Sequence, residues 1–396
     1  MVVNSIFIKQ NLLTNLGKMM KNLIKLSTLG AVLLFNGCVL DDDNNSEKDS
    51  SKRTFKLEKL SQLDLAKATD DKTEVTAEDM AQSKDGKYIF LADGSAGLKI
   101  LDVSDVKHPK LVAHYDDPSD SGANRGGFAR RITISHSGDV IYMADGLAGL
   151  KVIDVSTPTQ PTLLGKLDTK GFSHGITISA DDKFVYIADN GEDGGTPGLR
   201  VVNVSDPSSP AMVTQRDEQW ATQVALSANG EKLYITDKKA GIMITDTSNI
   251  SSFIGGVLDF ANTRLGSYVV TDKGISADIV LSKDGKRAYV ANKKPGIKIL
   301  DISDASHPKL LGKYDGDGFA GESIAKSIAL SKDEKRLYIA NRKTGVEVID
   351  ISDVTAPKKI SSVKTSSAED VMLSKDERYL YVADGQAGFK VISISK

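Results

Sequence analysis

The chain repeats one short pattern seven times, and this repetition restricts the possible folds more than any other feature. The pattern, S-x-D-G-x-x-h-Y-h-A-[DN] with h apolar, appears first as SKDGKYIFLAD at residues 83–93 and last as SKDERYLYVAD at residues 374–384. A glycine-led run of alternating apolar residues follows each copy, such as GLKVIDVS at residues 149–156. The last positions of the seven copies lie 43 to 55 residues apart: Asp93, Asp145, Asp189, Asp237, Asn292, Asn341 and Asp384. Periods of this length are typical of propeller blades.

Each copy is predicted to supply four strands, which together make one blade. The first strand is the apolar run before the serine, the second contains the tyrosine, the third is the glycine-led run, and the fourth follows a proline, as at residues 161–167. The repeated Asp and Gly are typical of turns, so we interpret them as structural. A repeated catalytic aspartate is the alternative, and seven near-identical copies argue against it. The expected fold is all-β: a seven-bladed β-propeller of four-stranded blades over residues 55–396.

The ring is predicted to close through its N-terminal segment. The seventh copy ends at Lys396, directly after its third strand, so it lacks an outer strand. Residues 60–64, LSQLD, match the outer-strand residues 164–168, LGKLD. We therefore expect residues 55–64 to pair with residues 388–395 as the outer strand of the seventh blade. This pairing would remove an exposed sheet edge that favours aggregation.

The N-terminal segment has the features of an export signal. Residues 20–38 begin with lysines, continue as an apolar stretch from Leu26 to Phe35 and end at Cys38. The apolar stretch is too short to span a bilayer, so a secretory signal is favoured over a transmembrane helix. Residues 1–18 fit neither part of a signal well, and the true start is expected at Met19 or Met20.

Cys38 is predicted to carry a lipid anchor. Residues 33–38, LLFNGC, resemble the lipobox of bacterial lipoproteins, which implies removal of residues 1–37 and diacylation of Cys38. Val39, rather than Asp, follows the cysteine, and by the same resemblance this implies sorting to the outer membrane of a Gram-negative bacterium. Residues 38–54 are rich in Asp, Asn and Ser and are expected to be a disordered tether. The alternative is an ordinary signal peptide whose cysteine is incidental.

Composition and missing motifs exclude several classes of function. The chain has 51 basic and 53 acidic residues and a net charge of −2, which argues against binding to duplex nucleic acid. A single cysteine excludes a disulfide framework and any cysteine-based zinc or iron–sulfur site. The five histidines form no H-E-x-x-H motif, and no G-x-S-x-G motif is present, so no catalytic residue is assigned.

The GLKVIDVS runs, with a proline a few residues later, resemble the LVIVD repeat of bacterial and archaeal cell-surface proteins. The resemblance covers residues 77–396, although the fourth copy, GIMITDTSNISSF, lacks the proline and the last lacks the aspartate. It implies a propeller at the cell surface and no particular reaction. The S-x-D-G element also resembles the repeats of YVTN-type and lactonase-type seven-bladed propellers, over the second strand only.

The copies diverge at the start of the first strand, which is expected to line the central channel. Six residues before the serine every copy has Ala or Ser, whereas the next two positions vary and carry charge. Identical copies would suffice for folding, so this divergence indicates a ligand site at the channel mouth. The candidate residues are Glu78, Asp79, Arg130, Arg131, His174, Gln223, Asp278, Lys326, Glu369 and Asp370.

Two interpretations of these charges remain open. Blades one and seven are neighbours, so Glu78, Asp79, Glu369 and Asp370 are expected to form an acidic arc beside Arg130 and Arg131. In the first interpretation these carboxylates bind Ca²⁺, the one cofactor considered, or a polar ligand, and the arginines hold an anionic group. In the second, the charges form compensating salt bridges around a water-filled funnel.

Three long segments, at residues 116–128, 190–198 and 260–275, are predicted to be partner-contacting loops on the same face. We therefore expect an exported, lipid-anchored, monomeric propeller that acts as a non-catalytic binding or scaffold module. Its expected partner is an envelope protein or a small polar ligand, and not nucleic acid. The alternative is a lactonase-like hydrolase at the channel mouth that uses His174, Arg130 and either Glu78 or Glu369.

Overall fold

The computed structural model describes residues 55–68, 76–117, 127–191, 195–217, 220–238, 241–250, 263–269, 274–292, 296–316 and 324–395. The chain divides into residues 1–52 and residues 53–396, and all described residues belong to the second unit. The predicted signal sequence, Cys38 and the 38–54 tether lie outside the described residues. Within the described ranges, no helix has the length and apolar character needed to cross a membrane.

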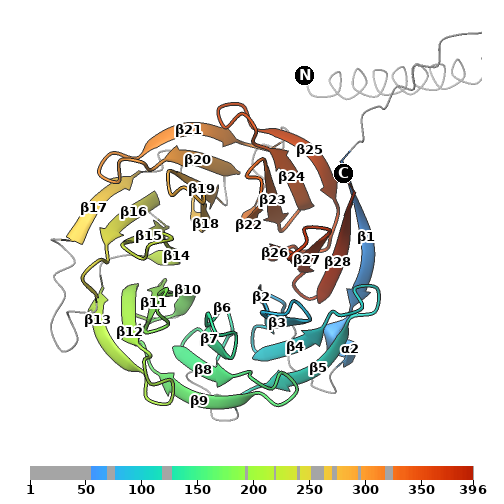
Figure 1. The fold of residues 1–396 in the computed structure, drawn as a ribbon, viewed down its shortest axis with the longest axis horizontal. Coiled ribbons are helices and arrows are strands. Elements are labelled where there is room, and N and C mark those ends of the chain that lie inside the picture. The colour runs from blue at the N-terminus through green and yellow to red at the C-terminus, as the bar shows by residue number, and fades with distance from the viewer. Residues whose placement is uncertain are drawn as a thin grey trace, which may run out of the picture. The chain divides into compact units, whose positions relative to one another are not determined.

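The described strands form seven four-stranded antiparallel sheets, arranged as blades around a central channel (Figure 1). Blades 1 to 3, each from the innermost strand outward, are β2 (Asp79–Gln82), β3 (Tyr88–Ala92), β4 (Leu98–Asp102) and β5 (Lys110–Tyr115); β6 (Arg131–Ile134), β7 (Val140–Ala144), β8 (Leu150–Asp154) and β9 (Thr162–Leu167); and β10 (Ser173–Ile178), β11 (Phe184–Asp189), β12 (Gly198–Asn203) and β13 (Ala211–Arg216). Blades 4 to 6 are β14 (Ala221–Leu226), β15 (Lys232–Asp237), β16 (Gly241–Asp246) and β17 (Arg264–Tyr268); β18 (Ser276–Leu281), β19 (Arg287–Asn292), β20 (Ile297–Asp301) and β21 (Lys309–Tyr314); and β22 (Ala325–Leu330), β23 (Arg336–Asn341), β24 (Gly345–Asp350) and β25 (Lys358–Val363). Blade 7 consists of β26 (Asp370–Leu373), β27 (Tyr379–Ala383), β28 (Phe389–Ser395) and, outermost, β1 (Lys56–Leu63), which the short helix α2 (Leu65–Ala68) follows. The seven-bladed, all-β fold predicted from the repeats is confirmed.

The N-terminal closure is confirmed as well. Strand β1 pairs antiparallel with β28, so that Lys56 lies opposite Ser395 and Leu63 lies opposite Phe389. One irregularity in the register falls between Lys59 and Ser61. The first strand of the propeller therefore completes the sheet that contains its last strand, as Figure 1 shows where β1 flanks β28.

The repeated serine stabilises the turn between the first and second strand of each blade. In blade 1, Ser83 Oγ donates a hydrogen bond to Asp85 Oδ1 at 2.6 Å and accepts one from the Tyr88 N–H at 2.9 Å. The same two bonds form in blades 2 and 4, where Ser137 and Asn229 replace the aspartate. Side chains that bond to nearby backbone in this way favour turns over continued strand. These repeated residues thus specify local backbone geometry.

The aspartate that ends the second strand is buried in an ion pair with the third strand. Lys151 Nζ lies 2.5 Å from Asp145 Oδ2, and both side chains are at most 3% exposed. Lys99 pairs with Asp93, Lys390 with Asp384, and Arg200 with Asp189 in the same way. These aspartates have the structural role that the repeat predicted, with basic partners that the repeat did not indicate. The signal for the partner is a basic residue at the third position of five of the seven glycine-led runs.

The hydrophobic core lies between neighbouring blades. Seven apolar clusters are present among the described residues, and each contains side chains from two adjacent sheets. Between blades 2 and 3, for example, Tyr142 and Val152 pack against Ile176 and Ile187. The second strand of each blade gives its cluster one aromatic side chain that is at most 2% exposed: Phe90, Tyr142, Tyr186, Tyr234, Tyr289, Tyr338 and Tyr381. Because blades cohere through these faces, the inner ends of all seven first strands are held close together.

Candidate functional site at the channel mouth

Small residues bring the seven first strands together at one end of the channel. A fully buried side chain lies at the start of each first strand or two residues before it: Ala77, Ala129, Ser173, Ala221, Ser276, Ala325 and Ala368. The residues that follow form what we call the mouth ring: Glu78, Arg130, His174, Thr222, Ala277, Lys326 and Glu369. All seven line a single cavity, together with Arg131 and Lys238. The mouth ring thus draws one residue from every blade.

Glu369 is the most heavily bonded carboxylate of the mouth ring. Arg342, from the link between β23 and β24, donates to its two oxygens at 2.6 and 2.7 Å. Lys326 Nζ lies 3.2 Å away, and Ser367 Oγ donates at 2.9 Å. Burial by itself would raise the pKa of Glu369, but the bonds from Arg342 and the charge of Lys326 hold that pKa below its ordinary value. Glu369 is therefore ionised at neutral pH, and burial lowers the pKa of its neighbour Lys326.

Arg130 is held between two aromatic rings. Its guanidinium carbon lies 4.2 Å from the ring centroid of Phe128 and 5.4 Å from that of Phe172. Its Nη1 lies 3.4 Å from Glu78 Oε2, while its buried Nε has no hydrogen-bond partner. Stacking on aromatic faces fixes the plane of a guanidinium without consuming its N–H donors. Arg130 is therefore positioned with donor capacity to spare.

The residue that follows each member of the mouth ring belongs to what we call the inner ring: Asp79, Arg131, Gly175, Gln223, Asp278, Ser327 and Asp370. Three of its carboxylates tie one blade to the next. Asp79 accepts a hydrogen bond from the Ile132 N–H at 2.8 Å. In the same way Asp278 accepts from Ile328 at 3.0 Å, and Asp370 accepts from Met80 at 3.2 Å. Gln223 reaches Asp278 with its Nε2 at 3.4 Å.

Arg131 is the cation at the centre of this inner ring. Its Nη1 lies 3.3 Å from Asp79 and 3.6 Å from Asp278. Burial raises the pKa of Asp79 well above its ordinary value, and Asp370 and Asp278 raise it further while Arg131 opposes the shift. Burial likewise raises the pKa of Asp370. One guanidinium thus faces three buried carboxyl groups, and two of them, Asp79 and Asp370, hold protons more tightly than exposed aspartates do.

The ten candidate residues lie together at the channel, and Glu78 and Asp79 lie beside Arg130 and Arg131, in two rings rather than one arc. Glu78 and Glu369 belong to the mouth ring, whereas Asp79 and Asp370 lie in the inner ring, and all four contact basic groups or backbone N–H donors. Among the described residues, no group of three or more His, Cys, Asp or Glu is arranged to hold a metal ion. Calcium binding here stays a prediction, and Ca²⁺ would have to displace the bonds already made. Arg342 was not among the predicted residues, because it lies in the link between β23 and β24 and not at the start of a first strand.

The three predicted partner-contacting loops, at residues 116–128, 190–198 and 260–275, compare differently with the structure. Residues 118–126 and 192–194 lie outside the described residues, so the first two predicted loops are described only at their ends. The prediction of a loop over residues 260–275 is wrong, because β17 lies within it and forms the outer strand of blade 4. The fourth copy lacks the proline that marks the outer strand elsewhere, so its start could not be predicted from the repeat.

Comparison with known proteins agrees with the repeat and the fold. The family model described as LVIVD repeat matches seven segments of the chain: residues 81–117, 126–169, 174–217, 221–255, 273–316, 323–365 and 366–396. Among solved structures, hydrazine synthase of Kuenenia stuttgartiensis is similar over 82% of this chain and 97% of that chain, with a TM-score of 0.62 and 17% sequence identity. At this identity the likeness shows the fold alone. No curated protein sequence matches the chain.

Proposed function

We propose that this chain, which belongs to the LVIVD-repeat family, is a non-catalytic binding module that holds an anionic ligand at the mouth of its channel. The observation that carries the proposal is the charge of the mouth ring and its rim. Five basic side chains, those of Arg130, Arg131, Lys238, Lys326 and Arg342, accompany two carboxylates, those of Glu78 and Glu369. Arg131 is paired with the inner-ring carboxylates Asp79 and Asp278, and the other four basic groups leave a net charge of +2 over Glu78 and Glu369. Clefts lined by one sign of charge concentrate ligands of the opposite sign.

Arg130 is the residue best placed to contact the anion. Its ring contacts with Phe128 and Phe172 fix the orientation of its guanidinium, and its contact with Glu78 is long, with Nη1 3.4 Å from Oε2. Hydrogen bonds between guanidinium and carboxylate or phosphate are stronger than those between neutral groups. The anionic group belongs either to a small polar ligand or to an envelope protein. In both cases the same side chains would recognise it.

The attachment of the chain agrees with a ligand site that faces away from a membrane anchor. Strand β1 starts at Lys56, opposite the end of β28 at Ser395, and β28 begins at the mouth end with Phe389 opposite Ala383. The segment before Lys56 therefore joins the propeller on the face opposite the channel mouth. If Cys38 is lipidated after export, as the lipobox predicts, the mouth stays accessible to ligands and partners.

Calorimetric titration tests the mouth site. We expect inorganic phosphate or succinate to bind the intact protein and neutral succinamide not to bind. Arg130→Gln and Lys326→Gln should each weaken binding at least tenfold, the loss that about 1.4 kcal/mol produces. Lys110→Gln, on the exposed outer strand β5, serves as the matched control and should leave binding unchanged. Equal binding by succinamide, or by Arg130→Gln, would contradict the proposal.

Hydrolysis is the alternative function at the same place. His174 Nδ1 lies 2.9 Å from the Thr222 carbonyl oxygen, so this nitrogen carries a proton and donates to that carbonyl. The bond orients the ring but supplies no nucleophile. Turnover of a lactone or ester that His174→Ala abolishes would establish the hydrolase in place of the binding module.

A further inference from the structure

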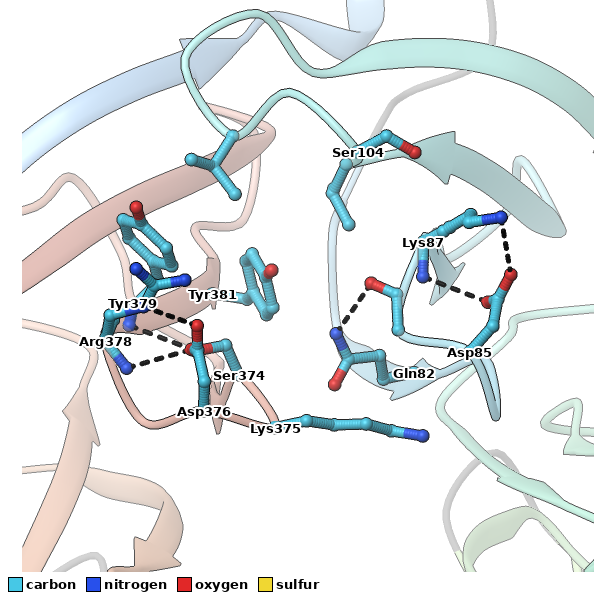
Figure 2. Close-up of a pocket in the computed structure, with 13 residues that line it drawn as sticks. Gln82, Asp85, Lys87, Ser104, Ser374, Lys375, Asp376, Arg378, Tyr379 and Tyr381 are labelled. Carbon is cyan, nitrogen blue, oxygen red and sulfur yellow. Dashed lines mark hydrogen bonds and ion pairs between the residues drawn. The ribbon is translucent and has the colours of Figure 1, made fainter.

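A second cavity lies on the opposite face, between blade 7 and blade 1. It has a volume of about 460 Å³, within the usual range for small-ligand sites. Its walls are the turn between β26 and β27, the turn between β2 and β3, and the link between β4 and β5 (Figure 2). We call it the seam pocket, because it lies at the junction where the ring closes. It shares no lining residue with the cavity at the channel mouth.

At three other junctions on this face, a carboxylate from one blade bonds to the preceding blade. Asp182 accepts hydrogen bonds from the His136 N–H, with both distances 3.0 Å. Glu334 accepts from the Lys283 N–H at 2.6 Å, and Glu377 accepts from the Lys332 N–H at 2.5 Å. Asp182, Glu334 and Glu377 have φ angles of +57°, +54° and +55°. This region of backbone conformation is unfavourable for residues other than glycine. The bond between blades accounts for an acidic residue in this conformation.

The seam has no such carboxylate of its own. The position that corresponds to Asp182, Glu334 and Glu377 is Gly86, with φ of +78°. The backbone group that corresponds to the three donors is the N–H of Lys375. A Cβ atom added to Gly86 would lie 3.5 Å from Gln82 Nε2 and 3.6 Å from Lys375 Cδ, which is ordinary contact. Glycine also occupies this position in blades 2, 4 and 5. In blade 2 the side chain of Lys84 fills the space, with its Cβ 3.2 Å from such an atom, whereas Gly230 and Gly285 have no atom within 4 Å. What distinguishes the seam is therefore the cavity beside Gly86.

The seam pocket combines an excess of basic groups with an apolar wall. Lys87, Lys375 and Arg378 line it with two acids, Asp85 and Asp376, which leaves a net charge of +1. Lys375 reaches across the junction to the Lys84 carbonyl. In Figure 2, Tyr379 and Tyr381 stand on the blade 7 side and Lys87 and Ser104 on the blade 1 side. Tyr381 and Val103 are at most 3% exposed and give the pocket an apolar floor.

The guanidinium of Arg378 is positioned at the edge of this pocket. Its Nε lies 2.5 Å from Asp376 Oδ2, and its guanidinium carbon lies 5.8 Å from the Tyr379 ring centroid. Arg378 is 72% exposed at its side chain, so its remaining donors face solvent at the pocket entrance. A ligand that enters the pocket meets a cation and an aromatic face together.

We propose that the seam pocket binds a carboxylate ligand that carries an apolar group about the size of an amino-acid side chain. The carboxylate takes the place that Asp182, Glu334 and Glu377 fill at the other three junctions, close to Lys375 and Arg378. The apolar group packs against Tyr379 and Tyr381. Two sources share this chemistry: a free carboxylic acid, and the C-terminal carboxylate of a protein that ends in an apolar residue.

Titration of the intact protein with matched probes tests the seam pocket. We expect 3-phenylpropionate to bind and its neutral amide to bind at least tenfold more weakly. A short peptide ending in phenylalanine is compared as its free acid and as its amide. Tighter binding of the free-acid peptide than of 3-phenylpropionate identifies a protein terminus as the source, and the reverse identifies a small acid. Equal affinity of acid and amide in both pairs overturns the proposal.

Gly86→Glu provides a decisive variant, because it supplies the missing carboxylate from the chain itself. We expect it to abolish binding of 3-phenylpropionate. The matched control is Gly285→Glu, at the same turn position in blade 5 and away from the seam, which should bind as the wild type does. Arg378→Gln, which alters an exposed side chain, should weaken binding at least tenfold. Unchanged binding in both Gly86→Glu and Arg378→Gln overturns the proposal. Arg130→Gln affects only the mouth site, so it distinguishes binding there from binding in the seam pocket.

Discussion

Asp79, Asp278 and Asp370 each accept a hydrogen bond from the following blade, and this gives the inner ring a structural role. In the mouth ring, by contrast, the corresponding contacts are ion pairs between side chains, as between Arg130 and Glu78. An ion pair can exchange a partner for a ligand, whereas a carboxylate bonded to backbone cannot leave without exposing a buried donor. Adjacent residues of one strand thus serve two purposes: the deeper one joins blades and the outer one faces the channel mouth.

The raised pKa of Asp79 predicts a stability that depends on pH. Burial raises the folded-state pKa above the ordinary value, so the folded protein binds this proton more tightly and loses stability as pH rises through that pKa. Asp79→Asn keeps an oxygen that can accept from the Ile132 N–H but cannot ionise. The measured quantity is the melting temperature of the variant minus that of the wild type. We expect this difference to be at least about 2 °C larger at pH 8 than at pH 5, which is the shift that roughly 1 kcal/mol gives a large domain.

Asp284→Asn is the control for this measurement. The Ser282 hydroxyl bond lowers the pKa of Asp284 below its ordinary value, so Asp284 stays ionised from pH 5 to pH 8 and its replacement should give a constant difference from wild type. If the melting temperature of Asp79→Asn also differs from that of the wild type by a constant amount between pH 5 and pH 8, protonation of Asp79 does not contribute to the stability of the protein.

Which residues surround the channel could be predicted from sequence, but how they pair could not. Counting back from the repeated serine identifies both positions of each first strand, because the repeat fixes the register. The partner of Glu369 is Arg342, which comes from the preceding blade's strand link, and no spacing within one copy brings these residues together. The stacking of Arg130 on Phe172 also joins two blades. Contacts between blades depend on the ring and are not encoded in any one repeat.

Among the strands, β1 and β17 show what decides whether an element can be predicted. Strand β1 lies 325 residues or more from its partner in sequence, yet its match to other outer strands and the incomplete last copy both indicated it. Strand β17 lies within its own blade, yet the missing proline left it without a signal. Prediction here depends on similarity to the repeat and not on proximity in the chain.

Removal of β1 is expected to lower the melting temperature strongly. The strand buries Leu57 in the core between blades 6 and 7, with Leu60 and Leu63 packed against the core between blades 7 and 1. Three partly or fully buried leucines contribute roughly 5 kcal/mol, and for a domain of this size the loss corresponds to about 10 °C. Thermal melting of a chain that starts at Asp64 measures it.

Lys59→Gln, which changes an exposed side chain of the same strand, is the control and should melt within about 1 °C of the wild type, as surface substitutions usually do. Addition of a synthetic peptide of residues 55–64 should restore part of the loss. If the shortened chain melts with the wild type, β28 needs no partner and the closure contributes nothing to stability.

For the whole molecule, the channel mouth and the site of chain entry lie on opposite faces of the propeller. A lipid at Cys38 would then be joined to the propeller through the chain that enters at Lys56. Cys38→Ala should release the exported protein into the soluble fraction, because a protein without its lipid has no covalent anchor. Membrane fractionation measures the release, and mass spectrometry of the mature N-terminus identifies the acyl groups. Unchanged membrane association of the variant, without acyl groups on the wild type, would contradict a lipid anchor at this residue.

The pairing of β1 with β28 also determines when the ring can close during synthesis. Strand β1 cannot pair until residues 389–395 have been synthesised, so the ring stays open while the blades between them are made. A product cut short before Phe389 would expose unpaired backbone on β1 and on the final blade, and such edges are open to proteases and to association with other chains. Synthesis of β28 is therefore also the step that protects both edges.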